Sequence, residues 1–153
     1  MKKAAVGILI SLLLMSCVLC ACDSMKEKPF DNTYNQVSQT YIAFIETAMK
    51  DWQKAVNEFC NLDAMDEDSK ERVLSGDLLV SYEIIRFEKL SDSLWVVETL
   101  TKTEEDFNGT YGVNYVGLLN GKWDVFLNKR NIPTVLTEGV EIPDYEIHDA
   151  AFH

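Results

Sequence analysis

The sequence contains few of the residues that most often supply catalytic and metal-binding groups. It has two histidines among 153 residues, and both, His148 and His153, lie close to the C-terminal end. A Ser-His-Asp or Cys-His catalytic arrangement cannot be assembled around them, and two histidines five apart near a chain end are typical of a solvated tail. The acidic stretch "TEEDFNGT" also fails as a calcium loop, because the twelfth position from Glu104 is Tyr115 instead of a glutamate. We therefore expect no metal and no cofactor.

Basic residues are scarce as well. Lys and Arg number 14 against 25 Asp and Glu, which gives a formal net charge of −11. A chain with this charge repels phosphate backbones and anionic lipid headgroups. The composition therefore argues against nucleic acid as a partner.

Three of the four cysteines, Cys17, Cys20 and Cys22, stand at the end of an uncharged run that follows Lys2 and Lys3. A short basic segment followed by an apolar run is typical of an export signal. Residues 19–22, "LCAC", resemble the lipobox of bacterial lipoprotein signal peptides. The resemblance implies that residues 1–21 are cleaved and that Cys22 carries the lipid. It also implies that residues 22–32 tether the protein to the outer side of the cell membrane.

The cysteine-rich run has two alternative interpretations, an uncleaved anchor and a zinc site. The uncharged run is long enough to span a bilayer as an uncleaved anchor. The three cysteines are too closely spaced, inside an apolar segment, to suit the tetrahedral geometry of a zinc site. Cleavage before Cys22 would leave 132 residues and a formal charge of −13, which is enough chain for one ordinary domain. Cys60 would then be the remaining ordinary thiol, either buried and inert or linked to a second copy.

The first half of this mature chain has helical periodicity. Apolar residues recur every three or four positions over residues 33–60, which predicts one long amphipathic helix. A shorter helix is predicted from Asp66 to Ser75, with acidic residues in its first turn and Gly76 as its stop.

The second half alternates between apolar and polar residues. Strands are predicted at about 78–90, 94–103, 111–119 and 122–129, joined by short turns into an antiparallel meander. The fold class is therefore α+β. A three-residue loop around "LSDSL" would set Arg86 opposite Glu98 and Phe87 opposite Val97, and it would place Ile85 on the core face with Phe87.

The turn at Asn120-Gly121 favours a two-residue hairpin and so predicts its register. Tyr115 would pair with Phe126 and Val116 with Val125. One face would then carry the core residues Asn114, Val116, Leu118, Trp123, Val125 and Leu127. The other face would carry Tyr111, Val113, Tyr115 and Phe126. That outer face is half apolar and needs a cover, which we expect to be either the C-terminal tail, residues 131–153, or a protein partner such as a second copy.

Residues 33–130, with a long helix, a shorter one and a meander ending in "VNYVGLLNGKWDVFL", resemble the nuclear-transport-factor-2-like (cystatin-like) superfamily. The resemblance implies a curved sheet wrapped around the long helix as a cone, with a pocket at its open end and frequent dimerisation through the outer sheet face. Such a pocket would lie near Asn114, Trp52 and Trp123.

Two functions are compatible with this pattern. The favoured one is a non-catalytic binding or assembly module that holds a small ligand in the cone or a protein on the outer sheet face. The alternative is a small pocket enzyme of isomerase or lyase type. Such an enzyme needs a tuned carboxylate and a hydroxyl donor in an apolar pocket, and no matching pair stands out.

Overall fold

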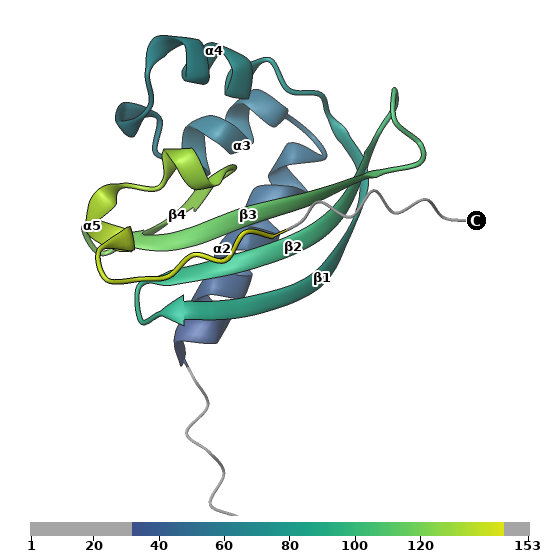
Figure 1. Cartoon of the computed structure of the whole chain (residues 1–153). Helices are drawn as coiled ribbons and strands as arrows, with labels where there is room; N and C mark the ends of the chain where they lie inside the picture. The colour runs from purple at the N-terminus through teal and green to yellow at the C-terminus, as the bar shows by residue number, and fades with distance from the viewer. Residues whose placement is uncertain (1–31, 146–153) are drawn as a thin grey trace, which may run out of the picture. The chain divides into compact units, whose positions relative to one another are not determined.

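Helices α2 (Asn32–Ala48) and α3 (Trp52–Phe59) pack on one face of a four-stranded antiparallel sheet, and the short helix α5 (Thr134–Thr137) packs on the other, in the computed structural model, which describes residues 32–145 (Figure 1). A further helix is α4 (Glu67–Leu74), and the 3-10 turns are η1 (Leu62–Ala64) and η2 (Lys129–Asn131). The strands are β1 (Leu79–Ser91), β2 (Leu94–Thr103), β3 (Thr110–Leu119) and β4 (Lys122–Phe126), adjacent in that order. The predicted α+β class and four-stranded meander are confirmed. The predicted signal peptide, Cys22 and both histidines lie outside the described residues.

The single helix predicted over residues 33–60 is wrong, because the chain forms two helices there. Helix α2 ends at Ala48 and α3 begins at Trp52. Asp51 has an extended backbone, and its side chain accepts a hydrogen bond from the backbone N–H of Lys54, so it caps α3. Both helices bury their apolar residues in the same core, where the rings of Phe44 and Trp52 lie 6.1 Å apart. The apolar period therefore continues across the break.

Helix α4 begins as predicted, but Gly76 is not the residue that caps its C-terminal end. Asp66 caps the helix by accepting from the backbone N–H of Ser69, and Ser75 is the C-terminal cap. Gly76 lies directly against the indole of Trp52, where a Cβ would come within 2.4 Å of Cε2. The same indole donates a hydrogen bond of 2.6 Å to the carbonyl of Val73. The absence of a side chain at Gly76 lets α3 and α4 pack this closely.

The register of the β3–β4 hairpin is the predicted one. Tyr115 pairs with Phe126 and Val116 with Val125. The turn residues Asn120 and Gly121 have φ values of 52° and 82°, as a type I′ turn requires. Asn120 is the one non-glycine residue with positive φ among residues 32–145.

The β1–β2 pairing is also confirmed at Arg86–Glu98 and Phe87–Val97. The connecting loop has two residues instead of three, and a bulge between Lys89 and Ser91 restores the register. A second bulge follows Ile84, and it leaves Ile85 48% exposed. The placement of Ile85 on the core face is therefore wrong, since a bulge inserts one residue and shifts the alternation.

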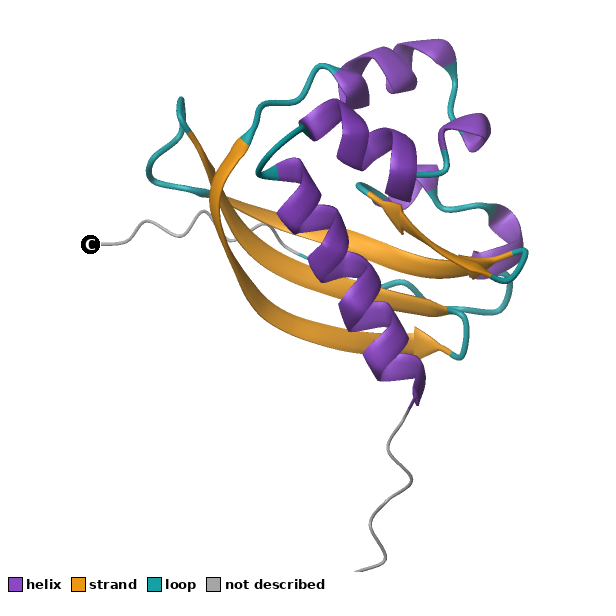
Figure 2. Ribbon diagram, turned by 180° about the vertical axis from the view of Figure 1, so that it is seen from behind, coloured by secondary structure: helices purple, strands orange, loops and turns teal. Residues whose placement is uncertain are grey.

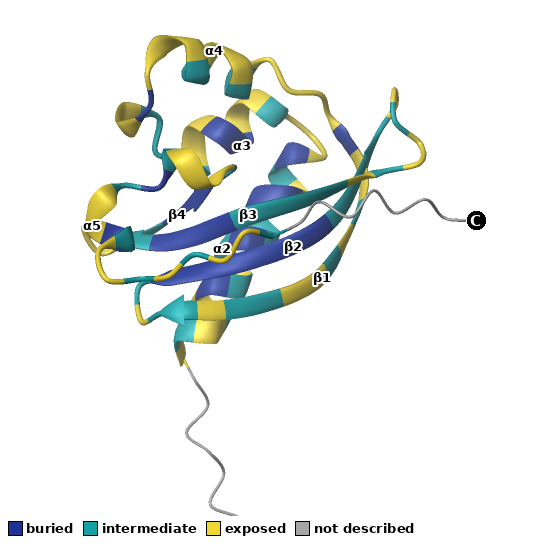
Figure 3. Ribbon diagram, in the orientation of Figure 1, coloured by how far each residue is buried: buried dark blue, intermediate teal, exposed yellow. Residues whose placement is uncertain are grey.

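Two hydrophobic clusters lie on opposite faces of the sheet. The first fills the space between the helices and the sheet, which curves around α2 (Figure 2). Its fully buried members include Val37, Tyr41, Phe44, Val56, Val97, Val116 and Val125. The second lies between the outer face and the segment that follows β4. Figure 3 shows the consequence: buried residues concentrate on the first half of β2, on the half of β3 near α5 and on the end of β4. Strand β1 is intermediate or exposed after Leu79, its one buried residue.

Residues 32–145 thus contain both clusters and the elements that build them. The unit Asn32–His153 therefore contains its own hydrophobic core, as an independently folding domain requires.

Candidate functional site

A hydrogen-bonded polar group of three residues lies in the interior between the helices and the sheet. Asn114 on β3 donates through Nδ2 to the hydroxyl of Tyr41 at 2.7 Å and to Thr99 Oγ1 at 3.4 Å. Tyr41 and Thr99 are fully buried. Burial raises the pKa of Tyr41 to about 12, so its hydroxyl keeps its proton near neutral pH. Asn114 is thus the hydrogen-bonded interruption of an apolar core.

The two tryptophans predicted beside Asn114 have separate partners. Trp52 donates to the carbonyl of Val73, and Trp123 donates to Gln36 Oε1 at 3.2 Å. Surface cavities of about 490, 580 and 660 Å³ lie around α3, α4 and the turns near them. None of these three cavities is lined by Asn114, Trp52 or Trp123.

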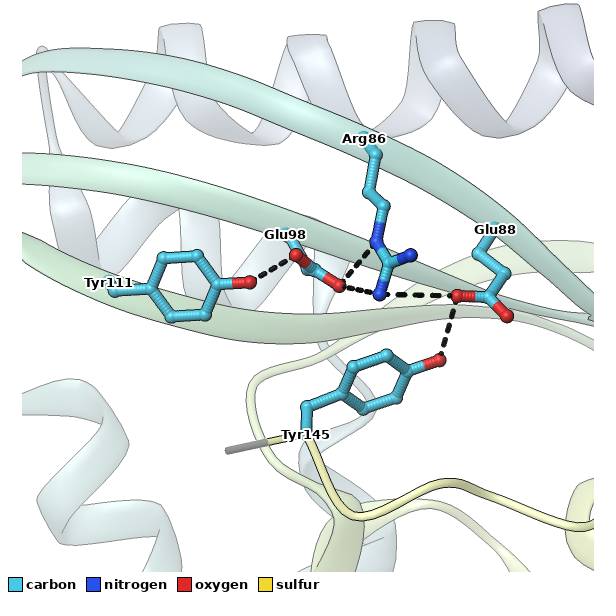
Figure 4. Close-up of polar contacts among 5 residues, drawn as sticks. All are labelled: Arg86, Glu88, Glu98, Tyr111 and Tyr145. Carbon is cyan, nitrogen blue, oxygen red and sulfur yellow. Dashed lines mark hydrogen bonds and ion pairs between the residues drawn. The ribbon is translucent and has the colours of Figure 1, made fainter. Parts of the chain in front are cut away.

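A buried carboxylate lies on the outer face, where Glu98 of β2 is 5% exposed (Figure 4). The guanidinium of Arg86, on the neighbouring strand β1, donates from Nε and forms an ion pair with the same carboxylate oxygen. The hydroxyl of Tyr111 on β3 donates to the other oxygen. Burial, and then the bond to Glu98, raise the pKa of Tyr111 to about 12. Three adjacent strands thus converge on one carboxylate.

The chain after β4 closes over this group. Arg86 lies 3.4 Å from the carboxylate of Glu88, which accepts a hydrogen bond of 3.1 Å from the hydroxyl of Tyr145. The guanidinium carbon of Arg86 also lies 5.5 Å from the centre of the Tyr145 ring, within cation–π range. Burial, and then the bond to Glu88, raise the pKa of Tyr145 to about 12.

The predicted partner surface is divided between covered and open residues. Tyr115 and Phe126 are buried beneath a segment that includes Ile132, Leu136, Val140, Ile142 and Tyr145. Gly117 allows the close approach, because a Cβ there would lie 2.6 Å from Leu136 Cδ1. Tyr111 and Val113 keep intermediate exposure. Of the two covers expected from the sequence, the chain's own C-terminal segment occupies the α5 half of the face.

The opposite end of the sheet carries exposed apolar side chains. Phe107, in the loop that joins β2 to β3, is 71% exposed. Leu78 and Val80, where β1 begins, are 48% and 46% exposed, and Leu79 between them pairs with Thr103 at the base of the same loop. We refer to Leu78, Val80 and Phe107 as the apolar end.

The loop that presents Phe107 is internally ordered. Asp106 accepts from the hydroxyl of Thr110 at 2.7 Å and from the backbone N–H of Gly109 at 3.2 Å. These bonds, the Thr110 bond first, lower the pKa of the Asp106 carboxyl. Gly109 has a φ of 88°, in the region that favours glycine. Sequence reasoning recognised the acidic turn but missed Phe107, whose signal was a bulky aromatic residue inside a polar loop.

Residues 32–145 have neither a metal-binding cluster nor a membrane-spanning helix. No group of three or more His, Cys, Asp or Glu side chains there is arranged to hold a metal ion. No helix in this part of the chain combines the length and the apolar character needed to cross a bilayer.

The buried polar side chains described above are thus partners of one another. Comparison of the chain with protein-family models, with curated proteins and with solved structures gives no match.

Proposed function

We propose that this chain is a non-catalytic binding or assembly module, tethered to the outer side of the cell membrane by lipid on Cys22. The tether is supported by the basic, apolar and "LCAC" segments of residues 1–22. On this proposal the short polar segment of residues 23–31 links the lipid on Cys22 to the folded unit that begins at Asn32.

The observation that carries the binding function is the exposure of Phe107. Phe107 is 71% exposed on a hydrogen-bonded loop, at the same end of the sheet as Leu78 and Val80, and offers apolar surface that a protein partner can bury. Four exposed acidic residues surround this end: Asp77, Glu83, Glu104 and Glu105. The partner on this proposal is a protein with an apolar centre and a basic rim, either another envelope protein or a second copy that binds through a different face.

The filled interior supports a surface role over a pocket role. Tyr41, Phe44 and Val116 occupy the space between α2 and the sheet at no more than 1% exposure. Asn114 is held by Tyr41 and Thr99. Tyr111 and Val113, partly buried on the outer face, lie on the part of β3 that leads from the loop of Phe107, and they extend the proposed contact surface.

We also propose membership of the nuclear-transport-factor-2-like superfamily, with α2 and the curved sheet forming its cone. The packing of α2 across the sheet and the register of the last hairpin support this. An experimental structure of the mature chain, superposed on members of that superfamily, tests it. A different strand order from that group would contradict it.

The tether is tested by cell fractionation. The Cys22→Ser variant should move from the membrane fraction to the soluble exported fraction or accumulate uncleaved, because lipid attachment needs the thiol. Cys20→Ser, two positions away in the same run, is the matched control and should remain in membranes. Equal membrane retention of both variants without a lipid adduct on Cys22 would indicate an uncleaved spanning segment.

The contact surface is tested with purified residues 23–153 as bait against solubilised membranes of the source cells. Phe107→Ser should lose a protein that the unsubstituted bait retains. Val135→Ser, which removes an apolar side chain of 69% exposure at the other end of the sheet, should retain it. Retention by both variants would contradict a contact at the apolar end.

A further inference from the structure

A surface cavity of about 660 Å³ lies between α4 and the turn that follows β4. Arg72 of α4 lines one side, and Lys129 and Arg130 line the other, with Ser69, Asn128 and Asn131 among the remaining residues. Its volume is within the range of small-molecule sites. The cavity lies apart from the apolar end and from the Glu98 group, so it belongs to neither surface described above.

The charge of this cavity is opposite to that of the chain. Its lining has three cationic side chains against one carboxylate, that of Asp66. That carboxylate is engaged as the cap of α4, accepting from the backbone and side chain of Ser69. The cavity of about 490 Å³ beside it is lined by three carboxylates and one lysine, and the cavity of about 580 Å³ by two carboxylates and one lysine. Local excess positive charge is therefore specific to the 660 Å³ cavity among these three.

The distribution of arginine strengthens this contrast. The whole sequence has three arginines, Arg72, Arg86 and Arg130. Arg86 holds the buried carboxylate of Glu98, and both of the others line the cavity. Arginine presents a planar set of N–H donors that suits multidentate oxyanions better than the point charge of lysine.

Donors at the cavity remain available. Within residues 32–145 the guanidinium of Arg130 has no hydrogen bond or ion pair. Arg72 uses Nε on the carbonyl of Asp68 and Nη2 weakly on Ser69 Oγ, at 3.2 and 3.5 Å, which leaves its other nitrogen free to donate. The ammonium of Lys129 donates to the carbonyl oxygen of Ile142 and to the carboxylate of Asp144. Its contribution to the cavity is therefore mainly positive charge.

We propose that this cavity binds a phosphate group, carried either by a soluble phosphate ester or by a phospholipid headgroup. Phosphate has several acceptor oxygens in a tetrahedral arrangement, and the cavity presents arginine donors from both sides. The chain has a formal charge of −11, so most of its surface repels anions. The local positive charge at this cavity attracts them.

The test is a titration of ¹⁵N-labelled residues 23–153 with sodium phosphate at constant ionic strength, followed by amide NMR shifts. Shifts should concentrate on residues 66–73 and 128–131. Arg130→Gln and Arg72→Gln should each weaken the response at least tenfold. Lys54→Gln, an exposed charge change of the same sign on α3, should leave it unchanged.

A second arm identifies the source of the phosphate. Vesicles of phosphatidylglycerol, with phosphatidylcholine vesicles as reference, are sedimented with the same variants. Binding to phosphatidylglycerol that Arg130→Gln abolishes supports the site with a lipid headgroup as ligand. Cavity shifts without vesicle binding support it with a soluble ester.

Absence of both responses overturns the proposal. Shifts spread over the surface, or equal losses in Arg130→Gln and Lys54→Gln, also overturn it, because they indicate unspecific screening of charge. Either result leaves the contact at the apolar end and the lipid tether untouched.

Discussion

Glu98 is buried in the middle of the sheet, and Arg86 on the next strand reaches its carboxylate from a side chain that is itself half exposed. The pair is therefore asymmetric. Loss of Glu98 leaves a guanidinium that water can solvate, whereas loss of Arg86 leaves a carboxylate in the interior with only Tyr111 as partner.

We predict that Arg86→Ala destabilises the folded state by about 2 kcal/mol, somewhat below the cost for fully buried pairs, and that Glu98→Gln costs less. Urea unfolding of residues 23–153 measures both. Lys70→Met, which breaks the exposed Lys70–Glu67 pair, serves as control and should show no measurable change. An Arg86→Ala chain as stable as the unsubstituted one would show that the carboxylate is solvated.

The Tyr41–Asn114 bond should behave as part of the core. Tyr41→Phe is expected to cost about 1 kcal/mol. Asn114→Ala is expected to cost more, because it leaves the buried Tyr41 hydroxyl without its donor. A double-mutant cycle by urea unfolding measures the coupling between the two changes. No coupling would mean that Asn114 is free to contact a ligand.

Cys60 should make stability fall with rising pH above about 9. Burial, with the Asp124 carboxylate as a second cause, raises the pKa of its thiol from 9.0 to about 12. The unfolded chain therefore releases this proton first, and stability present below pH 9 is lost as pH rises toward 12. The loss from pH 9 to 10 is expected to be about 1 kcal/mol in the urea midpoints. Cys60→Ala should lack this slope, and an equal slope in both chains would assign it to other groups.

Gly76→Ala should destabilise the contact between α3 and α4 by about 2 kcal/mol, because the added Cβ meets the Trp52 ring at 2.4 Å. Gly112→Ala is the matched control, since its Cβ would meet neighbours at ordinary distances of 3.5 Å or more. Thermal unfolding separates the two. Equal melting temperatures would show that the Trp52 indole moves aside without cost.

The fold was predicted best where local chemistry determines geometry. Asn120-Gly121 accepts positive φ at both positions, so the pairing of Tyr115 with Phe126 could be read directly from the sequence. The Arg86–Glu98 pairing was predicted from a three-residue loop, and it is correct because the two-residue loop is combined with the bulge between Lys89 and Ser91.

The errors arose where a local feature leaves the hydrophobic pattern unchanged. Asp51 starts a second helix as the N-terminal cap of α3, but Phe44 and Trp52 pack together on either side of it, and the apolar period hides the break. The bulge after Ile84 exposes Ile85 without any glycine or proline to mark it.

The candidate site depended on contacts between distant residues. Tyr145 reaches Glu88 across 57 positions of sequence, and the pattern of the C-terminal segment did not indicate this contact. The half-apolar outer face did indicate that something should cover Tyr115 and Phe126, and the choice between the tail and a partner needed the structure.

The central claim is that the apolar end contacts a protein partner in the cell. Replacement of Phe107 by a photoreactive phenylalanine derivative, followed by irradiation of living cells, tests it directly. Val135, equally exposed at the other end of the sheet, is the reference position. The account predicts one discrete cross-linked adduct from position 107 and none from position 135. An adduct of twice the chain mass identifies a second copy as the partner, and any other mass identifies a different envelope protein. No adduct from position 107, or the same adducts from both positions, would contradict it.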